Sequence, residues 1–478
     1  MKPFDVVIIG AGVVGVATGR ELSRYKLNIA ILEENDEPGF GVSKSNSGII
    51  HPGTQNPVGS LKGRLCVQGN ILTRSLSKEL GVDFKQVGEL IIAFSEEEVS
   101  RLVEIKQVAE LLHVPRLRIV DKHWLKINEP NLSGQAIAAL FAPTAGIISP
   151  YRLVYALCEN AIKNGVQIYT GHRVRSISKP PGDHFEIGTD NGVFKSRYVI
   201  NAAGLFADEI SKMVGVNDFK IRPRKGEEFI LDKKREHMAN HLLFPLPTAI
   251  SKGVLVIKTA DGNPMIGPTA EDVSDKEDLA TSDDGLKRAL TGARKMIPSI
   301  NEEDIIAYFA GLRPVAGEDF IIRHEAKVAG FVNVAGIQSP GLTAAPAIAI
   351  FVSELLKKNG LSMKKKFIFH SRSREIKHIA LTSFPETRRL LKKDPHYGDI
   401  VCRCELVSSK EVRDAIRRGA TTLDGIKFRT RAQAGRCHGS FCTTRIMKML
   451  AEEKKTALTG ITKRGKGSEI VKKDRLDE

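Results

Sequence analysis

The sequence predicts an α/β protein built from three parts. We expect a Rossmann-like dinucleotide-binding domain, an antiparallel-sheet substrate domain joined to it, and a small helical C-terminal domain that binds metal. Three observations lead to this prediction: a glycine-rich loop after the first apolar segment, alternating apolar and polar residues in the middle of the chain, and four of the six cysteines gathered in the last quarter. A chain of 478 residues is also long enough for two or three domains.

The N-terminal segment has the pattern of a βαβ nucleotide-binding unit. Residues 4–9 are apolar and predict a buried strand, the glycine loop Gly10-Ala-Gly12-Val-Val-Gly15 follows, and residues 13–25 predict a helix. A second strand over residues 28–32 ends at Glu33, about twenty residues beyond the loop, where such units hold the ribose hydroxyls. A pyrophosphate should therefore lie at the start of the first helix, against the glycine backbone.

The middle of the chain predicts the second domain. Segments 82–95, 221–231 and 253–258 alternate as strands of an antiparallel sheet do, and such a sheet could cover the cofactor and form the substrate pocket. Residues 151–165 predict a helix, and a strand over residues 194–201 ends in the small-residue turn Asn201-Ala-Ala-Gly204. This turn permits a close approach to the cofactor.

The chain then returns to the first domain. The strand-like segment 331–336 leads through the loop Ile337–Thr343 into a long apolar helix, residues 344–356. The positive end of that helix, near Thr343, should point at the cofactor. Residues 364–395 are basic and weakly periodic, so we interpret them as a connector.

The C-terminal cysteines have the spacing of an iron–sulfur site. A Cys-x-Cys pair and a Cys-x₄-Cys pair are separated by thirty-two residues, and two pairs supply the four thiolates that a [2Fe–2S] cluster needs. Zinc is the competing metal. Structural zinc sites usually use Cys-x₂₋₄-Cys knuckles, however, and the Cys-x-Cys pair fits that spacing less well. Ser408-x-x-Glu411 predicts a capped helix beside the site. The four predicted metal ligands are Cys402, Cys404, Cys437 and Cys442.

Composition restricts the partners and the compartment. The formal net charge is +16, which suits nucleic acid, a membrane surface, an anionic substrate or simply a solvated surface. No aromatic RNA-binding motif accompanies the basic residues, so we expect no nucleic-acid partner. The sequence shows neither a secretory leader nor an apolar run of about twenty residues, and we expect a cytoplasmic protein. Cys66 and Cys158 fit no ligand pattern and are predicted core residues.

The motifs named above, with Ser45-Asn-Ser-Gly-Ile-Ile-His51 and Gly311-Leu-Arg-Pro314, resemble the FAD-dependent amino-acid oxidase superfamily over residues 1–360. The C-terminal segment resembles the bacterioferritin-associated-ferredoxin-like [2Fe–2S] domain. The two in this order are similar to the catalytic subunits of anaerobic glycerol-3-phosphate dehydrogenases. The resemblance implies an FAD-dependent domain over residues 1–363, with its substrate side at 82–145 and 221–325, a connector over 364–395 and a [2Fe–2S] domain over 396–478.

The resemblance implies an FAD site along the first domain. Val174 would hold the adenine through its backbone, and the Ser45–Ser47 stretch would follow the ribityl chain and the ring. The residues assigned to FAD are Gly10, Gly12, Val14, Gly15, Glu33, Ser45, Asn46, Ser47, Val174, Ala203, Gly204, Gly311, Gly336, Ile337, Gly341, Leu342 and Thr343.

Two residues are the main candidates for catalysis. His51 is the candidate base, since a neutral imidazole near pH 7 can take a hydroxyl proton; alternatively, it only hydrogen-bonds the flavin or the backbone. Arg313 would bind a phosphate or carboxylate, unless it forms a structural ion pair with Glu318. Lys258 and Arg323 are weaker second cations on predicted strands of the covering sheet, where they could instead point to water.

The resemblance implies oxidation of sn-glycerol 3-phosphate to dihydroxyacetone phosphate. Hydride would pass to flavin N5, and electrons would leave through the cluster to a partner subunit or carrier, which could also attach the protein to a membrane. The stretches 46–53 and 65–69 are more similar to L-2-hydroxyglutarate dehydrogenases, so oxidation of a 2-hydroxy acid stays open. A proline- or sarcosine-type amino-acid dehydrogenase and a non-enzymatic electron-transfer subunit are further alternatives.

Overall fold

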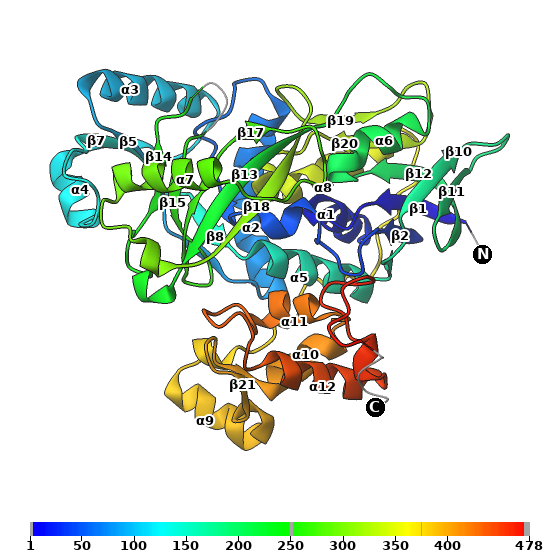
Figure 1. Ribbon diagram of the computed structural model, residues 1–478. Helices are drawn as coiled ribbons and strands as arrows, with labels where there is room; N and C mark the ends of the chain where they lie inside the picture. Colours follow the sequence, from blue (N-terminus) through cyan, green and yellow to red (C-terminus); the bar gives the residue numbers. More distant parts are fainter. Residues whose placement is uncertain (1–2, 249–251, 374, 473–478) are drawn as a thin grey trace.

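The computed structural model describes residues 3–248, 252–373 and 375–472. Two large sheets and their helices form the body of the molecule, and residues after the connector form a separate lobe, coloured orange to red in Figure 1, that packs beneath helix α5 (Pro150–Lys163). None of the helices in these ranges combines the length and the apolar composition that a membrane span requires.

The first sheet has eight strands and a parallel centre. Its order is β10-β11-β12-β1-β2-β9, with β20 beside β12 and β19 beside β20. The parallel pairs bring the carboxyl ends of β1, β12 and β20 to one edge, which is where ligands bind in such sheets. The strands are β1 (Phe4–Ile9), β2 (Ile29–Leu32), β9 (Gln167–Tyr169), β10 (Val174–Ser178), β11 (Phe185–Thr189), β12 (Gly192–Asn201), β19 (Ile321–His324) and β20 (Phe331–Ala335).

Helices cover this sheet and bury its apolar faces. Helix α1 (Val13–Leu22) packs against α8 (Gly341–Lys358) and α5, and α8 also packs against α2 (Leu61–Leu80). Both α1 and α8 begin at the edge where the parallel strands end. α8 begins earlier than the sequence predicted, since Gly341 is already helical. A short helix, α6 (Ala207–Lys212), follows β12.

The second sheet has nine strands and stands over the same edge; it is mixed and not purely antiparallel as predicted, because β14 pairs with β5 in parallel. Its order is β17-β13-β16-β15-β14-β5-β7-β6, with β18 beside β13. The strands are β5 (Glu89–Ala93), β6 (Arg118–Asp121), β7 (Ala138–Ala142), β13 (Arg222–Leu231), β14 (Leu242–Pro245), β15 (Leu255–Lys258), β16 (Pro264–Gly267), β17 (Glu271–Asp272) and β18 (Ile305–Val315). Helices α3 (Glu96–Leu111), α4 (Lys122–Asn128) and α7 (Asp283–Met296) pack on it.

The division between the two sheets differs from the sequence prediction at two places. β19 carries Arg323 and pairs with β20, so it belongs to the nucleotide-binding sheet and not to the covering sheet. The predicted strand over residues 82–95 is two strands in two sheets. Its first half, β4 (Phe84–Gln86), joins β8 (Gly146–Ile148) and β3 (Ile49–Ile50) in a small separate sheet.

The C-terminal lobe is helical with one short hairpin, β21 (Ile400–Cys402) and β22 (Val407–Ser408). The capping box predicted at Ser408 is present and opens α10 (Ser409–Arg417). α12 (Thr443–Lys454) begins directly after Cys442. α11 (Leu423–Thr430) was not predicted, and it is the helix of the lobe that faces α5.

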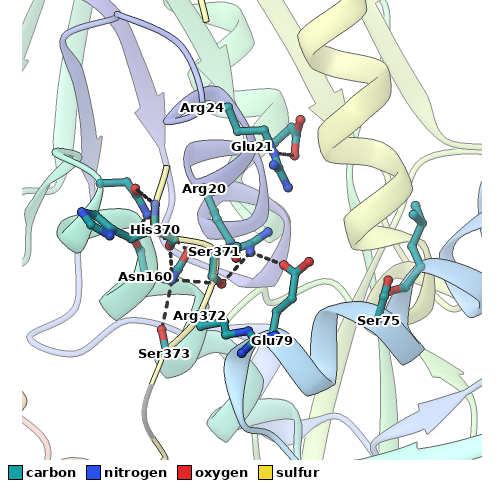
Figure 2. Close-up of polar contacts among 12 residues, drawn as sticks. Arg20, Glu21, Arg24, Ser75, Glu79, Asn160, His370, Ser371, Arg372 and Ser373 are labelled. Atoms are coloured by element: carbon teal, nitrogen blue, oxygen red, sulfur yellow. Dashed lines mark hydrogen bonds and ion pairs between the residues drawn. The ribbon is translucent and has the colours of Figure 1, made fainter. Parts of the chain in front are cut away.

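The connector is anchored to the first domain along its first half. Residues 370–373 lie over α5 and α1, where Asn160 donates hydrogen bonds to the carbonyl of His370 and the hydroxyl of Ser373 (Figure 2). Arg20 of α1 donates to the carbonyl of Ser371 and pairs with Glu79 at 2.6 Å. The connector then forms α9 (Phe384–Lys393) and enters the lobe. The first half of the connector is therefore bound to the first domain, and this attachment fixes where the lobe begins.

Candidate functional site

A cavity of about 1240 Å³ lies between the carboxyl edge of the first sheet and the second sheet. It is larger than the roughly 300–1,000 Å³ of an ordinary small-molecule pocket, so it has room for a dinucleotide and a small substrate. Loops of the nucleotide-binding sheet line one part, and β13 and β18 of the covering sheet line another.

The glycine loop brings backbone close to neighbouring strands and to the cavity. Gly10 has φ +103°, and a Cβ there would lie 2.5 Å from the carbonyl oxygen of Ala202. A Cβ at Gly15 would lie 2.0 Å from the carbonyl oxygen of Gly10, so this glycine lets the helix meet the strand turn. Gly12 faces the cavity, and Ser43, which the sequence did not suggest, accepts a hydrogen bond from the N–H of Val13 at 3.0 Å.

Glu33 closes the nucleotide end of the cavity. Its carboxylate accepts hydrogen bonds from the N–H of Ala11 at 2.7 Å and from the N–H and side chain of Asn35 at 3.0 and 2.7 Å. Burial raises the pKa of Glu33, and these hydrogen bonds oppose the rise. The carboxylate is thus held beside the glycine loop, where it can accept ribose hydroxyls.

Two glycines on the covering sheet make room at the other end. Gly226 on β13 lies opposite Gly311 on β18. A Cβ at Gly311 would lie 2.8 Å from the hydroxyl of Ser45, and one at Gly226 would lie 2.3 Å from the guanidinium of Arg313. The cross-strand glycine pair therefore leaves room for the side chains of Ser45 and Arg313 against the sheet.

Most of the residues that the sequence assigned to the site line this cavity. The structure brings them together from four distant segments of the chain. The cavity-lining residues among them are Gly10, Gly12, Val14, Glu33, Ser45, Asn46, Ser47, His51, Val174, Ala203, Gly204, Gly311, Arg313, Ile337, Gly341 and Leu342.

Three assigned glycine-loop and helix residues lie behind the cavity wall. Gly15 serves the packing described above, and Gly336, with φ +67°, approaches Ala316. The hydroxyl of Thr343 accepts a hydrogen bond from the N–H of His51 at 2.9 Å and donates one to the carbonyl of Ile49 at 3.3 Å. Thr343 therefore ties the loop that carries His51 to the start of α8.

The two predicted second cations lie outside the cavity lining. Lys258, the last residue of β15, pairs with Glu236 at 3.9 Å. Arg323 pairs with Glu325 at 2.9 Å and with Asp218, because its strand belongs to the nucleotide-binding sheet. Each is held in a salt bridge outside the cavity lining, so the structure gives no support for the substrate role predicted for these two residues.

Lys252 is a cavity cation that the sequence did not single out. It lines the cavity, and Lys62 and Arg313 lower its pKa in addition to the larger effect of burial. Arg313 also lines the cavity and donates hydrogen bonds to the carbonyls of Thr269 and Lys225; within the described residues it forms no ion pair with Glu318. Two cations whose charges interact can share one doubly charged anion.

Glu228 of β13 is a buried carboxyl group in the same part of the cavity. Burial raises the pKa of Glu228 to about 8, although Arg313 opposes the rise. Its Oε2 has no hydrogen-bond partner among the described residues. Glu228 can thus present either a protonated or a charged oxygen to a substrate hydroxyl near neutral pH.

His51 is buried and neutral at the cavity wall. Burial, and next the positive charge of Lys252, lower the pKa of His51 to about 4. One ring nitrogen, Nδ1, lies 3.7 Å from a carboxylate oxygen of Glu89, and the other, Nε2, lies 3.4 Å from the hydroxyl of Ser339, a cavity residue. A neutral imidazole in this position can accept a proton from a substrate hydroxyl.

The four C-terminal thiols form two close pairs across the two cysteine segments. Cys404 and Cys437 have their sulfurs 3.5 Å apart, and Cys402 is hydrogen-bonded to Cys442. That bond from the partner thiol lowers the pKa of Cys402 to about 6, and backbone N–H groups of Gln433 and Glu405 add to the effect. N–H groups of Gly439 and Phe441 lower the pKa of Cys437 against the effect of burial.

This donor set fits a binuclear cluster. In the described ranges, no group of three or more Cys, His, Asp or Glu side chains, the four cysteines included, is placed to hold a single metal ion. The cysteines lie instead as two thiol pairs with backbone N–H donors, which is the two-plus-two set that a [2Fe–2S] cluster uses. The Cys402 and Cys442 side chains are buried, Cys437 is half-buried and Cys404 is exposed. One edge of the site therefore meets the solvent.

Buried charges join the lobe to the nucleotide-binding domain. Glu37, four residues beyond Glu33, pairs with Arg429 of α11 at 2.8 Å, and both side chains are buried. The guanidinium of Arg429 also stacks on the ring of Tyr155 at 3.6 Å. Glu37 further accepts a hydrogen bond from the N–H of Thr421 at 2.8 Å. The lobe is thus docked at the loop that follows Glu33.

Comparison with known proteins agrees with both sites. A family described as FAD dependent oxidoreductase matches residues 5–355, and one described as BFD-like [2Fe-2S] binding domain matches residues 400–452. The chain is 41% identical over 471 residues to glycerol 3-phosphate dehydrogenase from Caloramator mitchellensis, covering 98% of each chain. It is 30% identical over 336 residues to mitochondrial L-2-hydroxyglutarate dehydrogenase from Nematostella vectensis, covering 66% of this chain and 73% of the relative.

A solved structure shows the same fold around FAD. The dithionite-reduced L-alpha-glycerophosphate oxidase from Mycoplasma pneumoniae, with FAD bound, superposes with a TM-score of 0.74 at 32% identity, covering 78% of this chain and 99% of that one. At Gly12 and Gly204 a side chain would enter space that is open or bounded only by Ser43, so the cavity accommodates the cofactor that the family uses. The chain belongs to the FAD dependent oxidoreductase family and ends in a BFD-like [2Fe–2S] binding domain.

Proposed function

We propose that this protein is a dehydrogenase that oxidises sn-glycerol 3-phosphate to dihydroxyacetone phosphate. The observation that carries the proposal is the 41% identity, over 98% of both chains, to a protein named glycerol 3-phosphate dehydrogenase. The cavity supports it, because Arg313 and Lys252 supply two positive charges for a phosphate.

The residues of the cavity divide the chemistry between them. Arg313 and Lys252 bind the phosphate and orient the carbon chain. His51 takes the proton of the C2 hydroxyl at Nε2, and the surrounding burial excludes water. FAD, when bound, supplies the hydride acceptor at N5. Ser45–Ser47 and the N-terminal end of α8 would hold its ring, with the positive helix end toward it.

We also propose that electrons leave through the C-terminal cluster to a partner subunit or carrier. The support is structural: the lobe is docked by the buried pair of Glu37 and Arg429, and Cys404 lies exposed at its surface. A relay of one-electron steps suits an external electron acceptor, so oxygen should be a poor electron acceptor.

A substrate panel tests the proposal. The FAD-loaded protein is mixed anaerobically with glycerol 3-phosphate, L-2-hydroxyglutarate, proline and sarcosine, and the loss of the oxidised flavin absorbance is followed. Rapid bleaching by glycerol 3-phosphate is expected. Bleaching by L-2-hydroxyglutarate instead would show that the pocket selects a 2-hydroxy acid, and no bleaching at all would favour an electron-transfer subunit.

Paired lysine variants locate the phosphate contact. Lys252→Met should weaken glycerol 3-phosphate binding. Lys258→Met should not, because Lys258 lies on β15 outside the cavity lining and pairs with Glu236. Equal effects of the two changes would contradict the assignment of Lys252.

A further inference from the structure

A buried carboxylate stands behind His51 and outside the cavity lining. Glu89 is the first residue of β5, its side chain is 1% exposed, and its Oε2 lies 3.7 Å from Nδ1 of His51. That oxygen has no hydrogen-bond partner among the described residues. The other oxygen, Oε1, accepts a hydrogen bond from the hydroxyl of Thr54 at 2.6 Å.

The two oxygens of Glu89 are thus used differently. The Thr54 hydroxyl fixes one oxygen and thereby the plane of the carboxylate, while the free oxygen points to the imidazole. A buried anion without a donor is costly, and the ring N–H of His51, whose nitrogen lies 3.7 Å away, is able to donate to it. The separation exceeds a hydrogen bond, but catalytic hydrogen bonds are often long before the substrate is bound.

The backbone of His51 is fixed independently of Glu89. Its N–H donates to Thr343 at 2.9 Å, and its carbonyl accepts a hydrogen bond from Asn70 at 3.0 Å. The remaining freedom is rotation of the ring and the choice of the ring nitrogen that carries the proton. A carboxylate next to Nδ1 favours the proton there and leaves the lone pair on Nε2, on the side of Ser339 and the cavity.

We propose that Glu89 is a positioning residue for catalysis: it holds the proton of His51 on Nδ1 and so directs the basic Nε2 at the substrate hydroxyl. This inference rests on the proposed function, in which His51 is the base. No bond to carbon changes at Glu89. When His51 takes the hydroxyl proton, the carboxylate stabilises the positive ring that forms.

The charges around His51 agree with this role. Glu89 raises the pKa of His51, while burial and Lys252 lower it more; Lys252 in turn faces Glu89, Cys66, Lys62 and Arg313. These charges also allow a second role for Glu89, in which it does nothing but neutralise the charge of Lys252. The experiment has to separate these two roles.

The decisive variant is Glu89→Gln, tested with the full-length FAD-loaded protein. The amide keeps the size and the acceptor for Thr54, but its NH₂ group faces Nδ1 and favours the tautomer with the proton on Nε2. We expect the anaerobic rate of flavin reduction by glycerol 3-phosphate to fall on the order of 100-fold, with FAD content and substrate affinity close to wild type. Glu89→Asp should restore part of the rate.

Two readouts distinguish positioning from a structural role. The reduction rate of Glu89→Gln should rise between pH 7 and 10, because hydroxide replaces a base that is directed the wrong way. When Glu89→Gln is combined with His51→Asn, the reduction rate should be little lower than in His51→Asn alone. The reason is that the effects of residues that act as a unit are not additive. If Glu89 only neutralises Lys252, the two effects should multiply and substrate affinity should change.

A matched control is present in the same domain. Glu129 is equally buried and contacts Nδ1 of His241 at 2.6 Å, away from the cavity lining. Glu129→Gln should lower thermal stability and leave flavin reduction unchanged. Full activity of Glu89→Gln, or a multiplicative double variant, would overturn the inference. Full activity of His51→Asn would instead overturn the proposed base itself, so the two failures are distinguishable.

Discussion

The FAD cavity and the cysteine site both place charged groups inside the protein, but they do so with different structural elements. The cavity uses side chains fixed by two large sheets, with Glu33, His51 and Glu228 buried at its wall and Glu89 buried behind it. The cysteine site uses two short loops, and the backbone N–H groups of Gln433 and Gly439 act on its thiols. The first site is thus a cavity between packed sheets, whereas the second is a set of two thiol pairs on loops.

The cores explain this difference. Several hydrophobic clusters stabilise the two-sheet region, including one that joins β1, α1, α5 and α8. The lobe has a single cluster of its own, around Val412, Ile426 and Ile446, on helices of 8 to 12 residues. A core of that size contributes little stability alone, so metal binding and docking through Arg429 should contribute much of it.

The largest expected effect is on the cysteine site. Cys402→Ser removes a thiolate from the buried pair, so the cluster should be lost while FAD and flavin reduction by substrate remain. Wild type should contain about two irons and two acid-labile sulfides per chain and show a reduced-cluster EPR signal after substrate addition. Cys158→Ala, a buried cysteine of α5 outside the cysteine site, should keep both. One zinc per chain without sulfide would mean that the site is misassigned.

The docking contact links the two regions and should come next in size. Glu37→Gln leaves Arg429 buried without its anion, which typically costs about 3–5 kcal/mol. The lobe should then lose thermal stability and pass electrons more slowly from FAD, while flavin reduction by substrate is unchanged. Arg418→Ala, which removes a more exposed pair with Glu159 on the same interface, is the control and should cost less than about 1 kcal/mol. Similar losses in both variants would show that burial of the ion pair is unimportant.

Within the cavity, Arg313→Ala should lower kcat/KM by 10- to 1,000-fold, about 1.5–4 kcal/mol for a lost charge-assisted contact to an anion. FAD content should stay near normal, because the glycine loop is elsewhere. Arg323→Ala removes an arginine paired with Asp218 and Glu325 outside the cavity and should leave kcat/KM unchanged. Unchanged turnover in Arg313→Ala would assign this residue a structural role.

The smallest expected effect is a pH dependence of stability that belongs to the cavity alone. The pKa of His51 is about 4 in the folded protein and about 6.5 when exposed, so the unfolded chain binds more protons between these values. The contribution of His51 to the free energy of unfolding should therefore rise from pH 4 to 6.5, by at most about 3 kcal/mol.

The measurement compares wild type with His51→Gln by denaturation at each pH. Glu228, whose pKa is raised to about 8, acts in the opposite sense between about pH 4.5 and 8, and the difference between the two proteins removes its contribution. A difference that does not change with pH would show that His51 titrates normally.

The sequence by itself determined the parts that depend on local patterns. The glycine loop and Glu33 are local signals, as are the four cysteines and the capping box at Ser408, and each of them lies where its motif predicts. Val174, Ala203 and Ile337 were placed through the family resemblance, and they do line the cavity.

Only the tertiary structure decided which charged residues share a site. Lys252 and Lys258 lie six residues apart, and only the first lines the cavity: Lys258 is the last residue of β15, whereas Lys252 lies in the loop that precedes this strand. Arg323 lies on β19, which pairs with β20 in the nucleotide-binding sheet, a long-range choice that no local pattern reveals. Glu89 and Arg429 became visible for the same reason: their partners, His51 and Glu37, lie 38 and 392 residues away, and burial between packed elements is what gives these charges a role.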